Sequence, residues 1–251
     1  MPKTVLITGA SSGIGAAMAL RLAREKSTLI LWGRDRARLD AVAQDCRALG
    51  AVVEIQAFDL RDSETMLAEL AAADARHAID LVILNAGLGG SVPATRLSED
   101  PLVAKAMAEI NFAAPVVAAS LAADLMARRR SGQIVLVGSV AGDYPLPMAP
   151  AYAGAKAGLA HFAEALRVRM AKHDVAVTLV TPGFIDTPMI DGVPQPKPFL
   201  ISADRAAEII LRRIASRPAR VVLPWQFAVL GLAVKLVPRP LLRAVLGRVP
   251  G

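Results

Sequence analysis

Cysteine and aromatic residues are scarce in this chain of 251 residues, which contains one Cys, two Trp and two Tyr. The single cysteine, Cys46, excludes an intrachain disulfide and is typical of proteins from a reducing compartment. It falls in a predicted helix over residues 36–48, where we expect it to pack in the core. The two Trp and the lack of aromatic residues between the arginines argue against nucleic-acid binding.

A targeting segment is also missing from the sequence pattern. The first residues run directly into an apolar stretch, without a charged segment followed by an apolar cleavage region, so we predict no signal peptide. We find no internal repeat and no low-complexity tract. We therefore expect a cytoplasmic protein, and no metal site is predicted.

The 54% hydrophobic content is sufficient for a large core in a single domain. Short apolar runs alternate with helical stretches, which predicts an α/β fold: a doubly wound parallel sheet of about seven strands with helices on both faces. We place this domain over residues 1–223 and a C-terminal extension over residues 224–251. The strands are predicted near residues 3–8, 28–33, 52–57, 80–84, 133–138, 175–180 and 220–223.

Tyr152 and Lys156 are four positions apart, a spacing that puts two side chains on the same face of a helix. The Lys156 ammonium is expected to favour the phenolate and to lower the pKa of Tyr152 from its ordinary value of about 10. Ser139 precedes this pair and adds a hydroxyl group. Together the three predict a site that reduces a carbonyl group, although a Tyr-Lys pair by itself also occurs on plain surface helices.

A glycine-rich turn near the N-terminus supports this interpretation. The apolar run Val5-Leu6-Ile7 leads into Thr-Gly-Ala-Ser-Ser-Gly-Ile-Gly at residues 8–15, and a helical stretch follows over residues 16–24. Glycines let the backbone approach a pyrophosphate, whose charge then rests on the amide groups at the start of the helix. A turn of this kind can also be a simple connection, but its position between a strand and a helix favours a dinucleotide site.

In these features the sequence resembles the short-chain dehydrogenase/reductase family, over about residues 3–189. The glycine turn has the family spacing TGxxxGxG, and Asn85-Ala86-Gly87 follows a predicted strand as in the family, with Leu84 where another Asn is more usual. Pro182-Gly183 and Thr187 match the family pattern after the sixth strand. The family's catalytic residues fall on Asn111, Ser139, Tyr152 and Lys156.

The resemblance implies a Rossmann-type fold and hydride transfer between a nicotinamide dinucleotide and a carbonyl or alcohol. It implies that Tyr152 exchanges the proton on the substrate oxygen, which Ser139 hydrogen-bonds. It also implies that Lys156 lowers the pKa of Tyr152 and holds the nicotinamide ribose, and that Asn111 keeps a water near Lys156; for Asn111, a role limited to bonding backbone stays open. The implied cofactor-binding residues are Gly9, Ser11, Ser12, Gly13, Ile14, Gly15, Arg34, Asp59, Leu60, Asn85, Ala86, Gly87, Tyr152, Lys156, Pro182, Gly183 and Thr187.

The end of the second predicted strand bears on the choice of cofactor. A carboxylate there would bind the ribose hydroxyls of NAD, but the position falls on Gly33 and Arg34 follows it. The planar guanidinium suits a phosphate, so we predict that NADP(H) is preferred over NAD(H). In the alternative, the arginines only cap a solvated loop and Asp35 holds the ribose. Asp59 resembles the family's adenine-contacting residue, but it could equally cap the helix that starts at Ser63.

Three segments are expected to select the substrate: residues 88–96, residues 142–151 and the loop after Pro182. Residues 184–200 contain four prolines and few charges, and they resemble the family's mobile lid. The apolar residues of this lid suit a small apolar ketone, aldehyde or alcohol as substrate.

The positive charge of the chain is concentrated at its C-terminus. Residues 205–251 hold nine Lys or Arg and one Glu, a net charge of +8, whereas residues 1–204 have a net charge of −1. The apolar run over residues 225–234 is too short to span a bilayer but long enough to lie in its surface. Two interpretations stay open: the extension packs on its own domain or in an oligomer contact, or it attaches the protein to a membrane.

Other functions are weighed against the carbonyl site. The family resemblance implies a homo-dimer or tetramer. The same fold also occurs in regulators that bind the cofactor as a signal and no longer catalyse a reaction. Such a regulator is expected to lose Tyr152 or Lys156, and both are present. The glycine spacing and the lack of a large C-terminal substrate domain argue against an extended-type sugar-nucleotide epimerase. A membrane-associated lipid or keto-acyl reductase is compatible with the basic extension.

Overall fold

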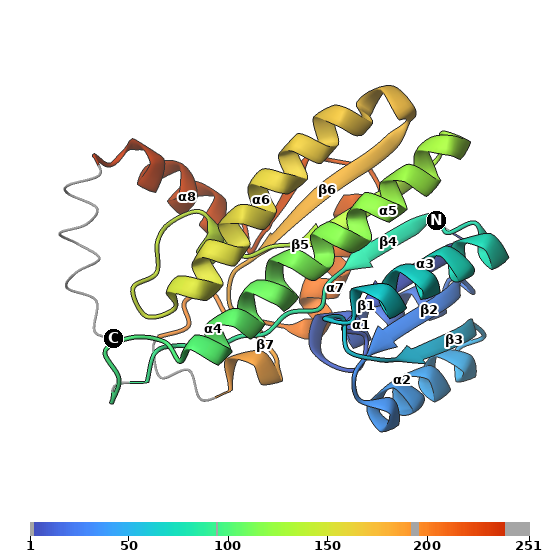
Figure 1. Ribbon diagram of the computed structural model, residues 1–251, viewed down its shortest axis with the longest axis horizontal. Helices are drawn as coiled ribbons and strands as arrows, with labels where there is room; N and C mark the ends of the chain where they lie inside the picture. Colours follow the sequence, from blue (N-terminus) through green and yellow to red (C-terminus); the bar gives the residue numbers. More distant parts are fainter. Residues whose placement is uncertain (1–2, 94, 192–195, 239–251) are drawn as a thin grey trace.

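In the computed structural model, which describes residues 3–93, 95–191 and 196–238, seven strands form one parallel sheet (Figure 1). The strands lie in the order β3-β2-β1-β4-β5-β6-β9. Their bounds are β1 Thr4–Thr8, β2 Thr28–Gly33, β3 Val52–Ala57, β4 Leu81–Leu84, β5 Gly132–Val137, β6 Val175–Pro182 and β9 Arg220–Leu223. The predicted α/β class, the parallel sheet and all seven strand positions are confirmed, with ends that differ by one or two residues.

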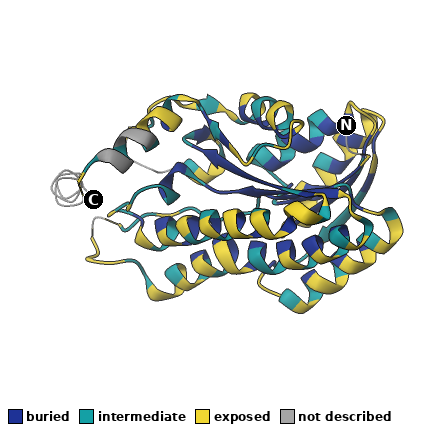
Figure 2. Cartoon of the chain, turned by 90° about the horizontal axis from the view of Figure 1, so that it is seen from above, coloured by how far each residue is buried: buried dark blue, intermediate teal, exposed yellow. Residues whose placement is uncertain are grey.

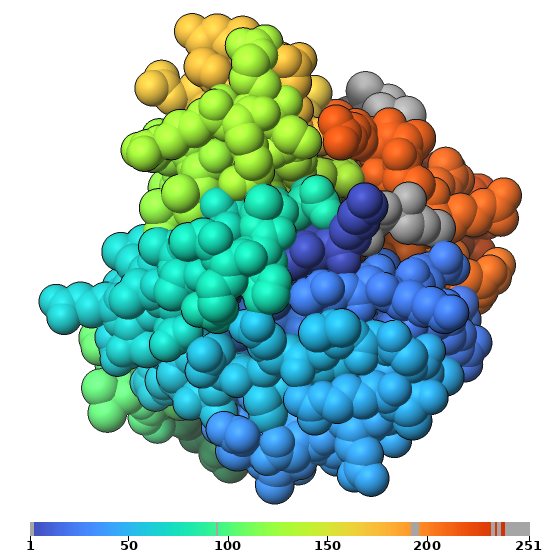
Figure 3. Space-filling model, turned by 90° about the vertical axis from the view of Figure 1, so that its right-hand side faces the viewer, coloured from blue at the N-terminus to red at the C-terminus, as the bar shows by residue number. Residues whose placement is uncertain are grey.

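Helices cover both faces of the sheet, so that the domain has three layers (Figures 1 and 2). Figure 2 shows the buried strands between two layers of helices whose outer sides are exposed. One layer contains α1 (Gly13–Ala23), α2 (Arg36–Ala48) and α7 (Ala203–Ile214). The other contains α3 (Ser63–His77), α5 (Ala114–Arg129) and α6 (Pro150–Met170). From the side, the blue and cyan surface of α2 and α3 adjoins the green to orange surface of α5, α6 and α7 (Figure 3).

Side chains alternate along each strand between the two helical layers. In β1, Val5 and Ile7 pack into the core under α1, α2 and α7, whereas Leu6 points to the opposite core. This is the two-residue period of a strand whose faces are both covered. Cys46 of α2 is fully buried in the first of these cores, as the sequence predicts.

Aspartates fix the starts of three helices. The side chains of Asp35, Asp62 and Asp100 accept hydrogen bonds from backbone N–H groups in the first turns of α2, α3 and α4 (Pro101–Ala108). Such caps satisfy donors that the helix itself leaves free. The helix that starts at Ser63, α3, is therefore capped by Asp62, and the alternative that Asp59 caps it is wrong.

The helical stretch Pro101–Arg129 is long and apolar enough to cross a bilayer by length and composition alone. It contains α4, a π-helical turn at Glu109–Ala113, and α5. The alanines of α5 are buried in the core that faces α3 and α6, among them Ala118, Ala119 and Ala122. This stretch is therefore an interior helix of the domain.

The chain changes direction in the sheet between β1 and β4. From β1 it continues to β2 and β3 on one side, and it then returns to β4 on the other side of β1. In doubly wound folds, such a reversal opens a crevice at the carboxyl ends of the two strands, and ligands bind there. A second small sheet pairs β7 (Ile185–Asp186) with β8 (Ile201–Ser202), within and next to the predicted lid over residues 184–200. Residues 192–195 of that lid lie outside the described residues.

The predicted extension begins directly after β9. Its described part contains α8 (Gln226–Leu236), which lies at the end of the molecule away from α2 and β3 (Figure 1). Residues 239–251, the rest of the predicted extension, lie outside the described residues.

Candidate active site

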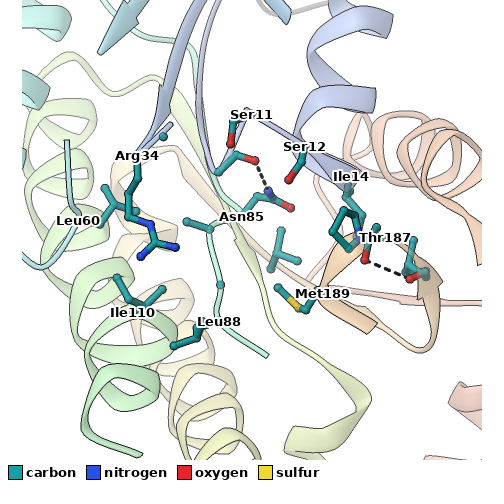
Figure 4. A pocket seen from close by; sticks show the side chains of 18 of the residues that line it. Ser11, Ser12, Ile14, Arg34, Leu60, Asn85, Leu88, Ile110, Thr187 and Met189 are labelled. Carbon is teal, nitrogen blue, oxygen red and sulfur yellow. Dashed lines mark hydrogen bonds between the residues drawn. The ribbon is translucent and has the colours of Figure 1, made fainter. Parts of the chain in front are cut away.

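A cavity of about 760 Å³ opens where the strands end, lined by residues that follow β1, β2, β4, β5 and β6 (Figure 4). The predicted site residues that line it are Gly9, Ser11, Ser12, Gly13, Ile14, Arg34, Leu60, Asn85, Ala86, Gly87, Ser139, Tyr152, Lys156, Pro182, Gly183 and Thr187. Gly15, Asp59 and Asn111 are also predicted site residues, but they do not line it. Among the described residues, no three His, Cys, Asp or Glu side chains come together as a potential metal site.

The glycine turn between β1 and α1 leaves no room for side chains. Gly9 has a φ of +66°, and a Cβ there would stand 2.8 Å from the Cα of Ala86. A Cβ on Gly15 would stand 2.2 Å from the carbonyl oxygen of Gly9. The backbone can therefore fold tightly at the start of α1 and present its N–H groups to the cavity, which suits a dinucleotide phosphate.

Thr8 and Asn85 bind this turn to the end of β4. The hydroxyl oxygen of Thr8 accepts hydrogen bonds from the backbone N–H groups of Asn85 and Ala86, each at 3.0 Å. In return, the Asn85 amide donates to the carbonyl oxygens of Thr8 at 3.1 Å and Gly9 at 3.3 Å. Asn85 therefore holds the turn in place from the neighbouring strand.

Arg34 stands at the end of β2 and points into the cavity (Figure 4). Asp35, the alternative ribose ligand, accepts a hydrogen bond from the backbone N–H of Arg38 at 3.0 Å and pairs with the Arg38 guanidinium at 3.2 Å. Arg36, on the outer side of α2, pairs with Asp40. Arg34, Arg38 and Arg61 all line this end of the cavity, but Arg38 is paired with Asp35 and Arg61 with Asp59.

Asp59 is bound by Arg61 rather than directed into the cavity. Its carboxylate accepts hydrogen bonds from both the backbone and the guanidinium of Arg61, at 2.6 to 3.1 Å. These bonds lower the pKa of Asp59 to about 2. Leu60, the next residue, is buried and lines the cavity instead. Of this pair, only Leu60 lines the cavity. A contact of Asp59 with the cofactor stays a prediction.

Tyr152, Ser139 and Lys156 meet on the other side of the cavity. Tyr152 and Lys156 lie one turn apart on α6, and Ser139 follows β5. Ser139 and Tyr152 line the same cavity, and the Ser139 oxygen accepts a hydrogen bond from the backbone N–H of Ala141 at 3.1 Å. Lys156 is 4% exposed, and its Nζ donates to the carbonyl oxygen of Val137 at 2.9 Å.

The pKa of Tyr152 differs from the sequence prediction. Burial raises the pKa of Tyr152 above its usual value, and the neighbouring Ser139 hydroxyl only partly opposes this effect. Burial also lowers the pKa of Lys156, to about 8. Its ammonium lies 5.8 Å from the centre of the Tyr152 ring. The expected lowering of the Tyr152 pKa by Lys156 is therefore wrong for this structure, because loss of water outweighs the neighbouring cation.

Asn111 is fully buried in the π-helical turn between α4 and α5. Its amide donates to the carbonyl oxygen of Leu88 at 2.8 Å and accepts from the Leu88 backbone N–H at 3.0 Å. A Cβ on Gly87 would lie 3.0 Å from the Asn111 Oδ1 and 3.7 Å from the Lys156 Nζ. Asn111 thus holds the segment after β4 close to Lys156. These bonds agree with the alternative interpretation, in which Asn111 only hydrogen-bonds the backbone. Its predicted role in keeping a water stays a prediction.

Two hydrogen bonds hold the predicted substrate segment 142–151: one from the predicted segment 88–96 and one from Glu99, which follows that segment. The backbone N–H of Val92 donates to the carbonyl oxygen of Met148 at 2.7 Å. The Glu99 carboxylate accepts from the backbone N–H of Ala151, at 2.9 Å to Oε2. Ala151 immediately precedes Tyr152, so Glu99 holds the first turn of the helix that carries the tyrosine. No spacing in the sequence indicates a link between residues so far apart.

A family model described as short chain dehydrogenase matches residues 3–197. The chain belongs to the short chain dehydrogenase family. An uncharacterized oxidoreductase of Myxococcus xanthus is 34% identical over 247 residues, which cover 98% of this chain and 97% of that protein. A 3-oxoacyl-[acyl-carrier-protein] reductase of Thermotoga maritima is 29% identical over 194 residues, covering 77% and 78% of the two chains. A short-chain dehydrogenase from Sphingobium yanoikuyae in complex with NADPH has a TM-score of 0.80 and 28% identity, covering 94% and 96%.

As a short chain dehydrogenase, the protein is an NAD(P)-dependent oxidoreductase that acts on CH–OH groups, so the predicted family and enzyme class are confirmed.

The sequence prediction missed several lining residues of the cavity. Ile110 lies there next to Asn111, and Arg38 and Arg61 lie near Arg34. The position of Arg38 four residues after Arg34 was a usable signal, whereas Ile110 reads as an ordinary core residue of an apolar helix.

Proposed function

We propose that the protein interconverts an apolar carbonyl compound and its alcohol, that it prefers NADP(H), and that Tyr152 acts as acid and base. The observation that carries this proposal is that Tyr152, Ser139 and Lys156 line the same cavity as the glycine turn. Two hydroxyl groups at one point can bind one substrate oxygen, and one of them can exchange its proton.

The side chains have separate roles in reduction. The cofactor, when bound, supplies the hydride to the carbonyl carbon. Ser139 hydrogen-bonds the carbonyl oxygen and holds it beside Tyr152. The raised pKa keeps the Tyr152 phenol protonated at neutral pH, and Tyr152 gives this proton to the oxygen as negative charge develops there. The Lys156 cation, held by the carbonyl of Val137, stabilises the phenolate that remains.

Arg34 supports a preference for NADP(H). Its guanidinium faces the cavity, and no carboxylate of the described ranges forms an ion pair with it, although its charge helps to lower the pKa of Asp59; the neighbouring arginines of α2 are paired with Asp35 and Asp40. An unpaired planar cation at the end of β2 suits the additional phosphate of NADP. The engaged carboxylate of Asp35 is less free to bind a ribose. The NADPH in the related Sphingobium yanoikuyae dehydrogenase supports the same choice.

The lining of the cavity supports an apolar substrate. Leu88, Ile110, Met189 and Ile190 all face it, from the segment after β4, the π-helical turn and the lid. Apolar walls around a few polar groups favour an apolar ligand that is oriented by one oxygen. The similarity to a 3-oxoacyl-[acyl-carrier-protein] reductase adds acyl-chain 3-keto compounds to the candidates.

The proposal is tested by a screen of NADPH oxidation. The purified protein is mixed with NADPH and a panel of apolar ketones, aldehydes and 3-ketoacyl thioesters, and the loss of NADPH absorbance is followed. We expect turnover with at least one apolar carbonyl, and slower turnover when NADH replaces NADPH. NADPH binding without turnover of any compound would overturn the proposal in favour of a cofactor-sensing regulator.

We further propose that the enzyme is a cytoplasmic homo-dimer or tetramer. The buried, free thiol of Cys46 supports a reducing compartment, and family resemblance supports the assembly. Light scattering of the purified chain, which measures its mass in solution, tests the oligomeric state. A monomer at micromolar concentration would contradict this part of the proposal.

A further inference from the structure

Five large apolar side chains are exposed around the start of α8. We call them the α8 patch: Phe199, Leu200, Trp225, Val229 and Leu230. Their exposed fractions range from 44% for Leu230 to 69% for Trp225. Isolated apolar side chains are normal on a protein surface, but a group of this kind marks a site of interaction.

Phe227 fixes the α8 patch to the wall of the active-site cavity. It is 4% exposed, and its ring packs edge-on against Phe199, with 5.7 Å between the ring centres. A Cβ on Gly183 would stand 2.2 Å from the Phe227 ring, so the ring lies directly on Gly183. Because Gly183 lines the cavity, the patch and the cavity share one wall.

The C-terminal segment, residues 224–251, carries three residues of the patch and has a positive net charge. Residues 224–251 contain four cations, Lys235, Arg239, Arg243 and Arg248, and no Asp or Glu. Beneath α8, Asp143 lies 3.7 Å from where a Cβ on Gly231 would stand, and its carboxylate is paired with Arg220 at 2.6 and 2.7 Å. Its negative charge is therefore balanced, and the sequence of residues 224–251 contributes cations without any carboxylate.

We propose that the α8 patch and the basic residues after it bind the surface of an anionic membrane. The α8 helix has 11 residues, about 16 Å at the usual rise, so it is too short to cross a hydrocarbon core of about 30 Å. Lying in the interface, it places Trp225 and Val229 among the acyl chains and the cations among acidic headgroups.

The charge of this segment favours a membrane over a second copy of the chain. A two-fold contact brings the same surface of both protomers together, so two segments without carboxylates would face each other. Like charges in such an interface repel. An anionic lipid surface instead offers the opposite charge along with an apolar interior.

Membrane binding here gives the proposed substrate a route of entry. The side of the cavity formed by Gly183, with Phe227 packed on it, would then be turned toward the lipid in which an apolar carbonyl compound dissolves. This last step rests on the proposed function, whereas the membrane contact does not, because it is measured without substrate or cofactor.

Flotation of the full-length protein with vesicles tests the proposal. Vesicles of phosphatidylcholine with phosphatidylglycerol are compared with vesicles of phosphatidylcholine alone. We expect flotation with the anionic vesicles only, and its loss in high salt, which screens the charges. The variant Trp225→Ser/Val229→Ser and the variant Arg239→Gln/Arg243→Gln/Arg248→Gln should each bind at least about tenfold more weakly.

Matched variants control for general changes in polarity and charge. Val52→Ser/Val168→Ser removes apolar side chains that are 61% and 70% exposed on β3 and α6. Arg36→Gln/Arg128→Gln/Arg130→Gln removes three exposed cations elsewhere. Both controls should float like the unchanged protein, and all variants should keep its melting temperature and its turnover of a water-soluble ketone. The proposal is overturned if the controls lose flotation equally, or if the unchanged protein does not float at all. If Trp225→Ser/Val229→Ser dissociates an oligomer, the patch instead contacts a second copy of the chain.

Discussion

The carboxylate of Glu99 accepts a hydrogen bond from the backbone N–H of Ala151, although 52 positions separate the two residues. The residue before α6, Ala149, has no side chain that can cap this helix, and Pro150 opens it. Glu99 therefore supplies the cap from another segment and places a negative charge at the positive end of the helix dipole. Tyr152 lies in the same turn, so its position depends on this contact.

We expect Glu99→Ala to lower both stability and turnover. Loss of a helix cap costs about 1 kcal/mol, or roughly 2–4 °C in melting temperature for a chain of this size. A small displacement of the acid from the substrate oxygen should reduce kcat about tenfold and leave the KM for NADPH nearly unchanged. Steady-state kinetics with the best substrate of the screen measure both constants.

The variant Glu99→Gln is the control for this prediction. Its side-chain oxygen can still accept from the Ala151 N–H, so kcat should return to within a few-fold of the original value. If Glu99→Ala and Glu99→Gln are equally slow, the hydrogen bond does not position Tyr152.

Tyr152→Phe should remove the acid without changing the shape of the cavity. We expect turnover to fall by about 10²- to 10⁴-fold, the usual contribution of a positioned acid. NADPH affinity, measured by the change in nicotinamide fluorescence on binding, should stay within a few-fold of the original. Lost binding together with lost turnover would assign Tyr152 a structural role.

Arg34→Ala should affect NADPH much more than NADH. A hydrogen-bonded charge contact is worth about 1.5–3 kcal/mol, so the KM for NADPH should rise roughly 10- to 100-fold while the KM for NADH changes little. Arg36→Ala, which removes a cation paired with Asp40 on the outer side of α2, serves as the control and should leave both values near the original. Equal effects of Arg34→Ala on the two cofactors would contradict the predicted preference.

The buried Lys156 should make stability depend on pH in the alkaline range. Its pKa is lowered by burial from 10.5 to about 8, so between these values the unfolded chain binds more protons than the folded one. The free energy of unfolding should therefore rise with pH from about 8, by roughly 1 kcal/mol per unit, relative to that of Lys156→Met. Denaturant unfolding at pH 8 to 9.5 measures this difference.

Lys172→Met, at an exposed position in the turn Ala171–His173, is the matched control. It should follow the unchanged protein over the whole pH range. If Lys156→Met shows the same pH dependence as the unchanged protein, the pKa of Lys156 is not lowered in the folded state and its ammonium is solvated there.

The sequence predicted most of the fold because local patterns determine it. The two-sided burial of the strands appears as continuous apolar runs such as Leu81–Leu84, and the glycine turn has a spacing that leaves few other structures. Most predicted site residues line one cavity for the same reason, because parallel strands bring the residues after their carboxyl ends to one edge of the sheet.

The errors concern properties that depend on the surroundings of a residue. The pKa of Tyr152 depends on how much water is excluded around it, and spacing along a helix contains no information about that. The sequence interpretation considered Asp59 as a possible cap of the helix that starts at Ser63, whereas in the structure Asp62 caps this helix and Asp59 contacts Arg61. Glu99 was not predicted at all, because its partner is a backbone N–H in a distant segment.

The two hydrogen bonds that the Thr8 hydroxyl accepts limit how this enzyme can be redesigned. The glycine turn is not an independent module that can be exchanged with the turn of a relative. Here Thr8, Gly9 and Asn85 form one bonded unit across two strands, so a transplanted turn that lacks the hydroxyl leaves the N–H groups of Asn85 and Ala86 without their acceptor. A successful exchange must therefore carry the end of β4 with it, whereas Arg34 lies outside this unit and can be changed alone.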